Sequence, residues 1–227
     1  MNPSTTERLS RIRVFQTLDN NALEHIAPFF VHHAFVRGQC ILTHGERSTA
    51  VYFLTEGRVR ATMYSPTGRE VSYQDLKPGE MFGELAALDQ LPRSMHVIGL
   101  TAGECLTIAR EDFMRLLAEH SGFAQAVLLK MAGLVRFLCD RLYEYATLSV
   151  AERLRAELIR LARQENHNGG EPIVIRNMPT HEELANRLAT HREAITRELG
   201  ALEKNGIVRK QRNVVTILNM RALQSLA

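Results

Sequence analysis

An unbroken helical pattern extends over residues 122–146 and limits the folds that this chain can adopt. The stretch "GFAQAVLLKMAGLVRFLCDRLYEYA" contains no proline, which is the residue that most strongly interrupts a helix. Its apolar residues recur with spacings of 3, 4, 3, 4 and 3, the heptad pattern of a helix that packs against another helix. These residues are Leu128, Met131, Val135, Leu138, Leu142 and Tyr145.

A second apolar face of the same helix, made by Val127, Leu134 and Phe137, is expected to pack on the preceding domain. The heptad face is then left for a partner, and the six residues above are predicted to form a homodimer interface. The alternative is a helix whose faces are all buried within one chain. The pattern favours the homodimer.

Before this helix, residues 35–108 contain many short apolar runs separated by turn signals. "AVYFLTEGRVRATMYS" consists of two such runs that meet at Glu56 and Gly57, which predicts a hairpin. "SPTGRE" predicts a second turn. This spacing predicts a small antiparallel barrel or jelly roll, with further strands at 71–76, 94–100 and 105–108.

After the long helix, the pattern predicts another helix over 150–163 and a polar, glycine-rich break, "QENHNGG". Two short helices joined by a tight turn should follow, the first beginning at Thr180, which forms a capping-box pattern with Glu183. A basic two-stranded hairpin, "IVRKQRNVVTIL", comes next. Helix, turn, helix and basic hairpin together indicate a winged helix-turn-helix.

The charge distribution supports a polyanionic partner for this C-terminal part. The whole chain has 28 Lys and Arg against 25 Asp and Glu, a net charge of +3. Residues 171–227 carry 9 of the basic and 6 of the acidic residues, so the entire excess lies there. An excess of this size is also compatible with an ordinary solvated surface.

In "THREAITRE", the spacing of four polar side chains places them on one exposed helix face. Arginine can bond bidentately to guanine, and glutamate can accept from the amino group of cytosine. The alternative is a solvated face with a Glu193–Arg197 ion pair. The predicted contacts to double-stranded DNA are Thr180, His191, Arg192, Glu193, Thr196 and Arg197 on the helices, with Arg209, Lys210 and Arg212 of the hairpin on the phosphates.

A second candidate site lies in "GEMFGELAALDQLPRSMHV", residues 79–97. Gly83 and Glu84 begin one predicted helical turn, whose first amides could receive a phosphate. Arg93 adds a permanent charge and Ser94 a hydroxyl. Glu84 beside a phosphate makes sense when it accepts a bond from a ligand hydroxyl such as that of ribose. This combination predicts a nucleotide, and the alternative is a surface loop with a Glu84–Arg93 ion pair.

"FGELA" followed by "PRS" resembles the phosphate-binding cassette of cyclic-nucleotide-binding domains. With the long helix and "THREAITRE", residues 15 to 220 resemble the CRP/FNR family of bacterial regulators, most closely its cyclic-AMP receptor branch. The resemblance implies an α+β fold, with a β-roll (jelly-roll) domain over 1–121, a dimerisation helix over 122–147 and a winged helix-turn-helix over 148–227. It assigns the ligand to Gly83, Glu84, Leu85, Arg93, Ser94, Leu138 and Cys139.

The implied activity is that of a homodimeric, cytoplasmic transcription regulator switched by cyclic AMP or cyclic GMP, and not of an enzyme. Its implied partners are a palindromic DNA operator with TGTGA-like half-sites and RNA polymerase. Three positions depart from the family. Leu138-Cys139 stands where a Thr-Ser pair contacts the base, and Met95 replaces a small residue. These departures leave open another purine, a base held by other groups, or a site no longer used.

Three rival functions follow from these features: a ligand-independent regulator, a nucleotide-responsive module acting on a protein, and, weakest, an enzyme. Three separated cysteines and the lack of a Cys-x-x-Cys or His-x-x-x-His pattern predict no metal or iron–sulfur cluster. The resemblance implies no haem, because the haem-sensing branch of the family alters the Gly-Glu segment that is intact here. The sequence shows no long apolar run and no secretory signal near its start, so we expect no membrane association.

Overall fold

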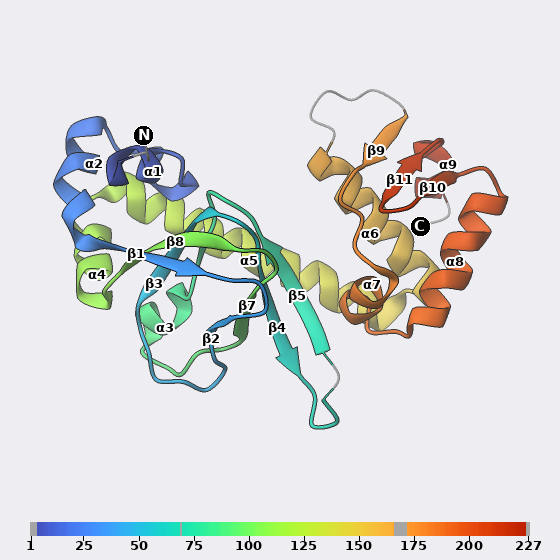
Figure 1. Ribbon diagram of the computed structural model, residues 1–227, viewed down its shortest axis with the longest axis horizontal. Helices are drawn as coiled ribbons and strands as arrows, with labels where there is room; N and C mark the ends of the chain where they lie inside the picture. Colours follow the sequence, from blue (N-terminus) through green and yellow to red (C-terminus); the bar gives the residue numbers. More distant parts are fainter. Residues whose placement is uncertain (1–3, 69, 166–171, 226–227) are drawn as a thin grey trace. The chain divides into compact units, whose positions relative to one another are not determined.

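The computed structural model describes residues 4–68, 70–165 and 172–225 (Figure 1). Contacts divide the chain into two compact units, Met1–Val135 and Arg136–Ala227. The long helix α5 (Ser121–Thr147) is continuous through this boundary and confirms the expected helix. Residues 166–170 of the expected glycine-rich break lie outside the described residues.

The first unit is a β-roll of two four-stranded antiparallel sheets, which confirms the expected α+β class. The first sheet has the order β1 (Phe30–Phe35), β8 (Gly103–Ile108), β3 (Val51–Glu56), β6 (Met81–Phe82). The second has the order β2 (Cys40–Leu42), β7 (His96–Gly99), β4 (Val59–Tyr64), β5 (Glu70–Leu76).

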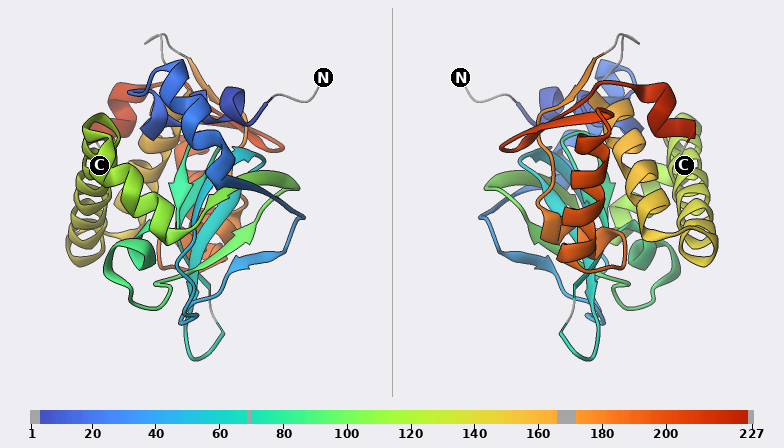
Figure 2. Two further views of the ribbon diagram at one scale, coloured as in Figure 1. Left: turned by 90° about the vertical axis from the view of Figure 1, so that its left-hand side faces the viewer. Right: turned by 90° about the vertical axis from the view of Figure 1, so that its right-hand side faces the viewer.

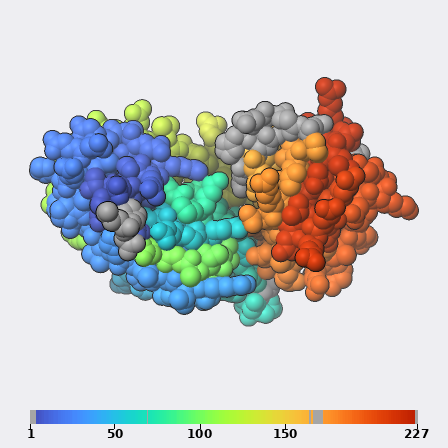
Figure 3. All heavy atoms as spheres, turned by 45° about the horizontal axis from the view of Figure 1, so that its top comes forward, coloured from blue at the N-terminus to red at the C-terminus, as the bar shows by residue number. Residues whose placement is uncertain are grey.

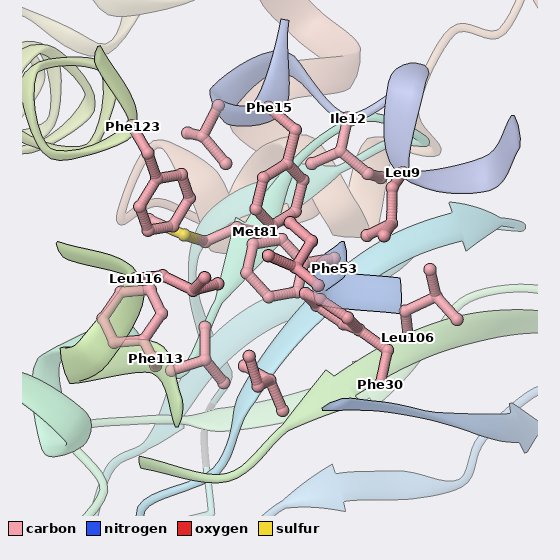
Figure 4. Close-up of a cluster of buried hydrophobic side chains, with 14 of the residues drawn as sticks. Leu9, Ile12, Phe15, Phe30, Phe53, Met81, Leu106, Phe113, Leu116 and Phe123 are labelled. Atoms are coloured by element: carbon pink, nitrogen blue, oxygen red, sulfur yellow. The ribbon is translucent and has the colours of Figure 1, made fainter. Parts of the chain in front are cut away.

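Short helices flank these strands (Figures 1 and 2). They are α1 (Thr5–Ser10), η1 (Arg13–Phe15), α2 (Asn20–Ile26), η2 (Ala27–Phe29), α3 (Glu84–Asp89) and α4 (Arg110–Glu119). Their apolar faces meet the first sheet in an aromatic core (Figure 4). Phe15 lies at its centre and stacks on Phe123 of α5, with ring centroids 5.0 Å apart. Burial of these rings fixes the start of α5 on the β-roll.

The turn at Glu56 and Gly57 does not make the hairpin that the sequence predicts. β3 pairs with β8 and β6, whereas β4 pairs with β7 and β5, so the turn carries the chain from one sheet to the other. Gly57 has a φ of +81°, and a Cβ there would lie 2.6 Å from the Ala102 carbonyl oxygen. The predicted turn at "SPTGRE" is confirmed, because it joins the paired strands β4 and β5.

Helix α5 has one face in the core and another in solvent. Phe123 and Val127 are buried, whereas Leu128, Val135 and Leu142 are at least 60% exposed. By length and composition alone α5 could cross a membrane, and 11% of its most apolar window is buried. A protein partner on the heptad face would also account for this exposed apolar surface.

The second unit contains α6 (Val150–Glu165), α7 (His181–Arg187), α8 (Arg192–Lys204) and α9 (Met220–Ser225). Its sheet has the order β10 (Val208–Gln211), β11 (Val214–Ile217), β9 (Ile173–Ile175). The hairpin of β10 and β11 is the expected wing, but β9 adds a third strand that the sequence pattern did not indicate. Leu158, Leu184 and Ile195 join α6, α7 and α8 in one core. The winged helix-turn-helix is confirmed.

A buried ion network connects α6 of the second unit to the last turns of α5 and to α7. The Glu157 carboxylate of α6 accepts from Arg141 of α5 at 2.8 Å and from Arg187 of α7 at 3.2 Å. Arg160 bonds to both Glu157 and Glu144. Burial raises the pKa of Glu157, but the surrounding arginines lower it more, so the pKa lies below its ordinary value.

Candidate functional site

The loop between α3 and β7 places Arg93 inside the β-roll, where its side chain is 3% exposed. Its amide donates to the carbonyl oxygen of Glu46, and its carbonyl accepts from the amide of Gly45. These backbone bonds attach Arg93 to the β2–β3 loop. The guanidinium donates from Nε to Ser48 Oγ at 2.9 Å, from Nη1 to the Gly83 oxygen at 2.7 Å and from Nη2 to the Ala50 oxygen at 2.8 Å.

All three partners of this guanidinium are neutral oxygens. No carboxylate forms an ion pair with Arg93 among the residues that the structure describes. The Tyr52 ring lies 6.0 Å away and adds a weak cation–π contact. Burial lowers the pKa of Arg93, although arginine stays protonated in proteins. A buried cation without a counter-charge is costly, so this site favours an anion.

Gly83 makes the close approach to Arg93 possible. It is the N-cap of α3 with a φ of +82°, and a Cβ there would lie 2.8 Å from Arg93 Nη1. Since glycine lacks a capping side chain, no side-chain cap bonds the first amides of α3 among the residues that the structure describes. The expected helical turn over "ELAALD" is confirmed as α3.

Glu84 does not pair with Arg93, which removes the alternative of a simple Glu84–Arg93 surface ion pair. Its carboxylate is 6% exposed and instead bonds to the ammonium of Lys130 on α5. The sequence reasoning missed Lys130. The helical spacing could have revealed this residue. Lys130 lies three residues after Val127 and four before Leu134, on the face predicted to meet the β-roll.

These groups meet at one pocket in the first unit. Five of the predicted ligand residues line it: Gly83, Glu84, Leu85, Arg93 and Ser94. Met95 and Lys130 also line the pocket, with apolar side chains that include Leu42, Leu76 and Leu134. The combination of an apolar wall, one buried guanidinium and a few polar groups is typical of a small-molecule site. Leu138 and Cys139 are exposed residues of α5 in the second unit, and their contact with a base stays a prediction.

The predicted DNA-contacting residues of the helices are exposed. The orange and red spheres of Figure 3 are atoms of the second unit. Thr180 caps α7 in a reciprocal capping box with Glu183, as predicted. His191 precedes α8, and within the described ranges its side chain makes no capping bond. Arg192, Glu193, Thr196 and Arg197 are all exposed on α8.

The alternative to base contacts by this helix face was an ion pair between Glu193 and Arg197. That ion pair is not formed within the described part of the chain. Arg197 instead bonds to Glu198 at 3.1 Å and remains 72% exposed. An arginine this accessible contributes little to stability through such a pair. It is free to reorient toward a ligand surface.

His181 joins the wing to α8, a role that the sequence did not reveal. Its Nε2 lies 2.8 Å from Lys210 Nζ, and its Nδ1 lies 2.7 Å from Thr196 Oγ1. The Thr196 hydroxyl also bonds to the Arg192 oxygen at 3.0 Å. A neutral His181 can make both of its hydrogen bonds, since Nε2 accepts from Lys210 and Nδ1–H donates to Thr196. Burial, then the nearby Lys210 and Arg192, lower the pKa of His181.

The wing presents the remaining predicted contacts. Arg209 and Lys210 are exposed on β10, and Arg212 lies in the two-residue turn with a φ of +50°. The Lys210 amide donates to Glu203 of α8 at 3.0 Å, so the wing is also attached through its backbone. No cluster suited to a metal ion occurs among the described residues.

Two family models match the chain over these two regions. The cyclic nucleotide-binding domain matches residues 32–120, and the Crp-like helix-turn-helix domain matches residues 152–226. The first range contains Arg93 and the pocket residues of the β-roll, although not Lys130 and Leu134 of α5, and the second contains the α7–α8 surface.

Known proteins also resemble this chain over nearly its whole length. The cyclic AMP receptor protein of Thermus thermophilus is 30% identical and covers 94% of this chain and 96% of its own length. A CRP-like cAMP-activated global transcriptional regulator of Mycobacterium tuberculosis is 24% identical over 96% of this chain and 97% of its own. The structure of a CooA variant from Carboxydothermus hydrogenoformans shares the fold, with a TM-score of 0.78, 16% identity and 88% of each chain covered. The chain therefore belongs to the CRP/FNR family and is a CRP-like transcription regulator with a cyclic-nucleotide-binding domain and a Crp-like helix-turn-helix domain.

Proposed function

We propose that this chain is a homodimeric, sequence-specific DNA-binding regulator controlled by a cyclic nucleotide bound at Arg93. The observation that carries the proposal is the buried guanidinium, which has neutral hydrogen-bond partners and no ion pair among the described residues. Three of its five N–H donors are used in these bonds, which leaves two for a phosphate oxygen. A phosphate would supply the missing counter-charge.

The other groups of the pocket fit the rest of such a ligand. Ser94 offers a hydroxyl to the phosphate, and Glu84 can accept from a ribose hydroxyl. Cyclic AMP is the first candidate because two relatives over nearly the full length are named a cAMP-activated regulator and a cyclic AMP receptor protein. Cyclic GMP is the second, because Leu138 and Cys139 lack the Thr-Ser pair of the cyclic-AMP receptors.

In the proposed complex, α8 reads base edges through Arg192, Glu193 and Arg197, and the wing contacts phosphates. Two copies joined through the exposed heptad face of α5 would present two α8 helices to one palindromic site. Half-sites in adjacent major grooves require a spacing of about 34 Å. The ligand can switch this arrangement only through a difference in affinity between two conformations. RNA polymerase is the partner that the family implies.

The nucleotide site is tested by calorimetry with cyclic AMP and cyclic GMP. Arg93→Leu should abolish binding because the phosphate loses its charged partner. Arg37→Leu, at an exposed position of the same unit, removes one positive charge outside the pocket and should bind normally. Undiminished affinity for both nucleotides in Arg93→Leu would refute the site.

The regulatory part is tested by DNA mobility shift with and without each nucleotide. Binding that is equal in both conditions would favour the alternative, a ligand-independent regulator. Arg197→Ala should relax base preference at one position of the site, at a cost of about 1–3 kcal/mol. A uniform loss over all sequences would instead identify Arg197 as a phosphate contact.

A further inference from the structure

Lys130 is the one charged group of the pocket that neither the sequence reasoning nor the family's cassette includes. It projects from α5, and its ammonium bonds to Glu84 Oε1 on α3. The Glu84 side chain is 6% exposed, whereas that of Lys130 is 27% exposed. The two residues and Arg93 line the same pocket.

Lys130 lies on the face of α5 that packs inward within the first unit. Val127, three residues earlier, is 2% exposed within the aromatic core. Leu134, four residues later, lines the same pocket. Lys130 therefore belongs to the inner face of α5, and a charged residue on such a face needs a partner there. Glu84 is that partner.

The charges that line the pocket decide which ligands it can accept. Arg93 and Lys130 are positive and Glu84 is negative, so together they leave one positive charge. A cyclic nucleotide carries one negative charge and would neutralise the pocket. Without Lys130, Arg93 and Glu84 would already cancel each other, and the ligand would bring an uncompensated charge into a partly apolar site.

We propose that Lys130 is a positioning residue for ligand binding: as the counter-ion of Glu84, it keeps the pocket at one net positive charge and so selects a monoanionic ligand. Lys130 acts through Glu84 and not by contact with the phosphate. Oε2 of Glu84 has no hydrogen-bond partner among the described residues, so one carboxylate oxygen holds Lys130 while the other can accept from a ligand hydroxyl. This inference rests on the proposed function of the Arg93 pocket.

A double-mutant cycle on the full chain tests the inference, with cyclic AMP as the probe in calorimetry. The four proteins are the unmodified chain, Lys130→Met, Glu84→Gln and the double variant. Lys130→Met should weaken binding about tenfold, equivalent to ~1.4 kcal/mol. In the Glu84→Gln variant, Lys130→Met should weaken binding by less than about twofold, because the carboxylate that Lys130 neutralises is absent. Lys130→Arg, which keeps the charge, should retain most of the affinity.

Two outcomes would overturn the inference while leaving the proposed function in place. An equal loss from Lys130→Met in both backgrounds would show that Lys130 contacts the ligand directly. No loss in the presence of Glu84 would show that its charge is irrelevant to binding. Absence of nucleotide binding by the unmodified chain would overturn both proposals, and unchanged binding by Arg93→Leu would overturn the Arg93 site itself.

Thermal unfolding without ligand tests whether the substitutions weaken binding only because they destabilise the fold. Lys130→Met leaves the Glu84 carboxylate buried and unpaired, so its thermal unfolding temperature should fall, and the added Glu84→Gln should restore it. Binding is then measured well below the unfolding transition of every variant. If Lys130→Met weakens binding only when Glu84 is present, and all variants are fully folded, the loss of affinity is due to Lys130.

Discussion

Replacing Gly83 by alanine should damage both the stability of the first unit and its nucleotide site. Gly83 has a φ of +82°, and a Cβ there would lie 2.8 Å from Arg93 Nη1 and 3.2 Å from the Ala50 oxygen. A left-handed conformation costs a residue other than glycine about 1–2 kcal/mol. Displacing the guanidinium also breaks its bond to the Gly83 oxygen, and bonds to charged groups contribute about 1.5–3 kcal/mol. We expect a total loss of roughly 2.5–5 kcal/mol.

Gly38→Ala is a matched control. Gly38 also has a φ of +82°, but a Cβ there meets nothing within 4 Å. It therefore isolates the backbone strain, about 1–2 kcal/mol. In urea unfolding followed by circular dichroism, Gly83→Ala should lose about 1.5–3 kcal/mol more than Gly38→Ala.

Calorimetry with cyclic AMP completes the comparison. Gly83→Ala should bind at least about tenfold more weakly, because its Arg93 is displaced, whereas Gly38→Ala should bind like the unmodified chain. Equal stability losses in the two variants, with nucleotide affinity unchanged in both, would contradict the reasoning. That result would mean that Arg93 does not depend on the close approach of Gly83.

Three further predictions concern the second unit and α5. Glu157→Gln should lower the free energy of unfolding by about 3–5 kcal/mol, whereas Glu165→Gln, exposed on the same helix, should have little effect in the same urea assay. Because the pKa of Glu157 is lowered on folding, its stabilisation is present above the unfolded pKa of 4.5 and is lost as pH falls through the lower folded value. His181 also has a lowered pKa, so thermal stability should decrease as pH falls below 6.5, and His181→Gln, which can still accept from Lys210, should flatten that dependence. Leu142→Glu should dissociate the proposed dimer in sedimentation equilibrium without destabilising the monomer, since Leu142 is 70% exposed; an unchanged mass would exclude the heptad face.

Much of the candidate site followed from local sequence signals. The "FGELA" and "PRS" segments predicted Glu84 and Arg93 near one ligand, and the structure places both at one pocket. The sequence could not show whether these two charges pair with each other. That depended on Lys130, which reaches Glu84 from 46 residues away. Ion pairs between distant segments leave no periodicity or motif, because they arise only when the elements that carry them are packed.

Elements that depend on local interactions could be predicted from the residues alone. The proline-free heptad pattern specified α5, and the Thr180–Glu183 capping box specified the start of α7. Backbone dihedrals, side-chain spacing and capping bonds act over a few residues, so they can be read from a short window.

The pairing of these elements became known from the folded chain. The structure assigned β3 and β4 to different sheets across the turn at Gly57, added β9 to the wing and joined His181 to Lys210. Each of these contacts joins segments whose partners are set by burial and backbone pairing over the whole domain. A local window contains the residues that can make such contacts, but the packed core selects which of them meet.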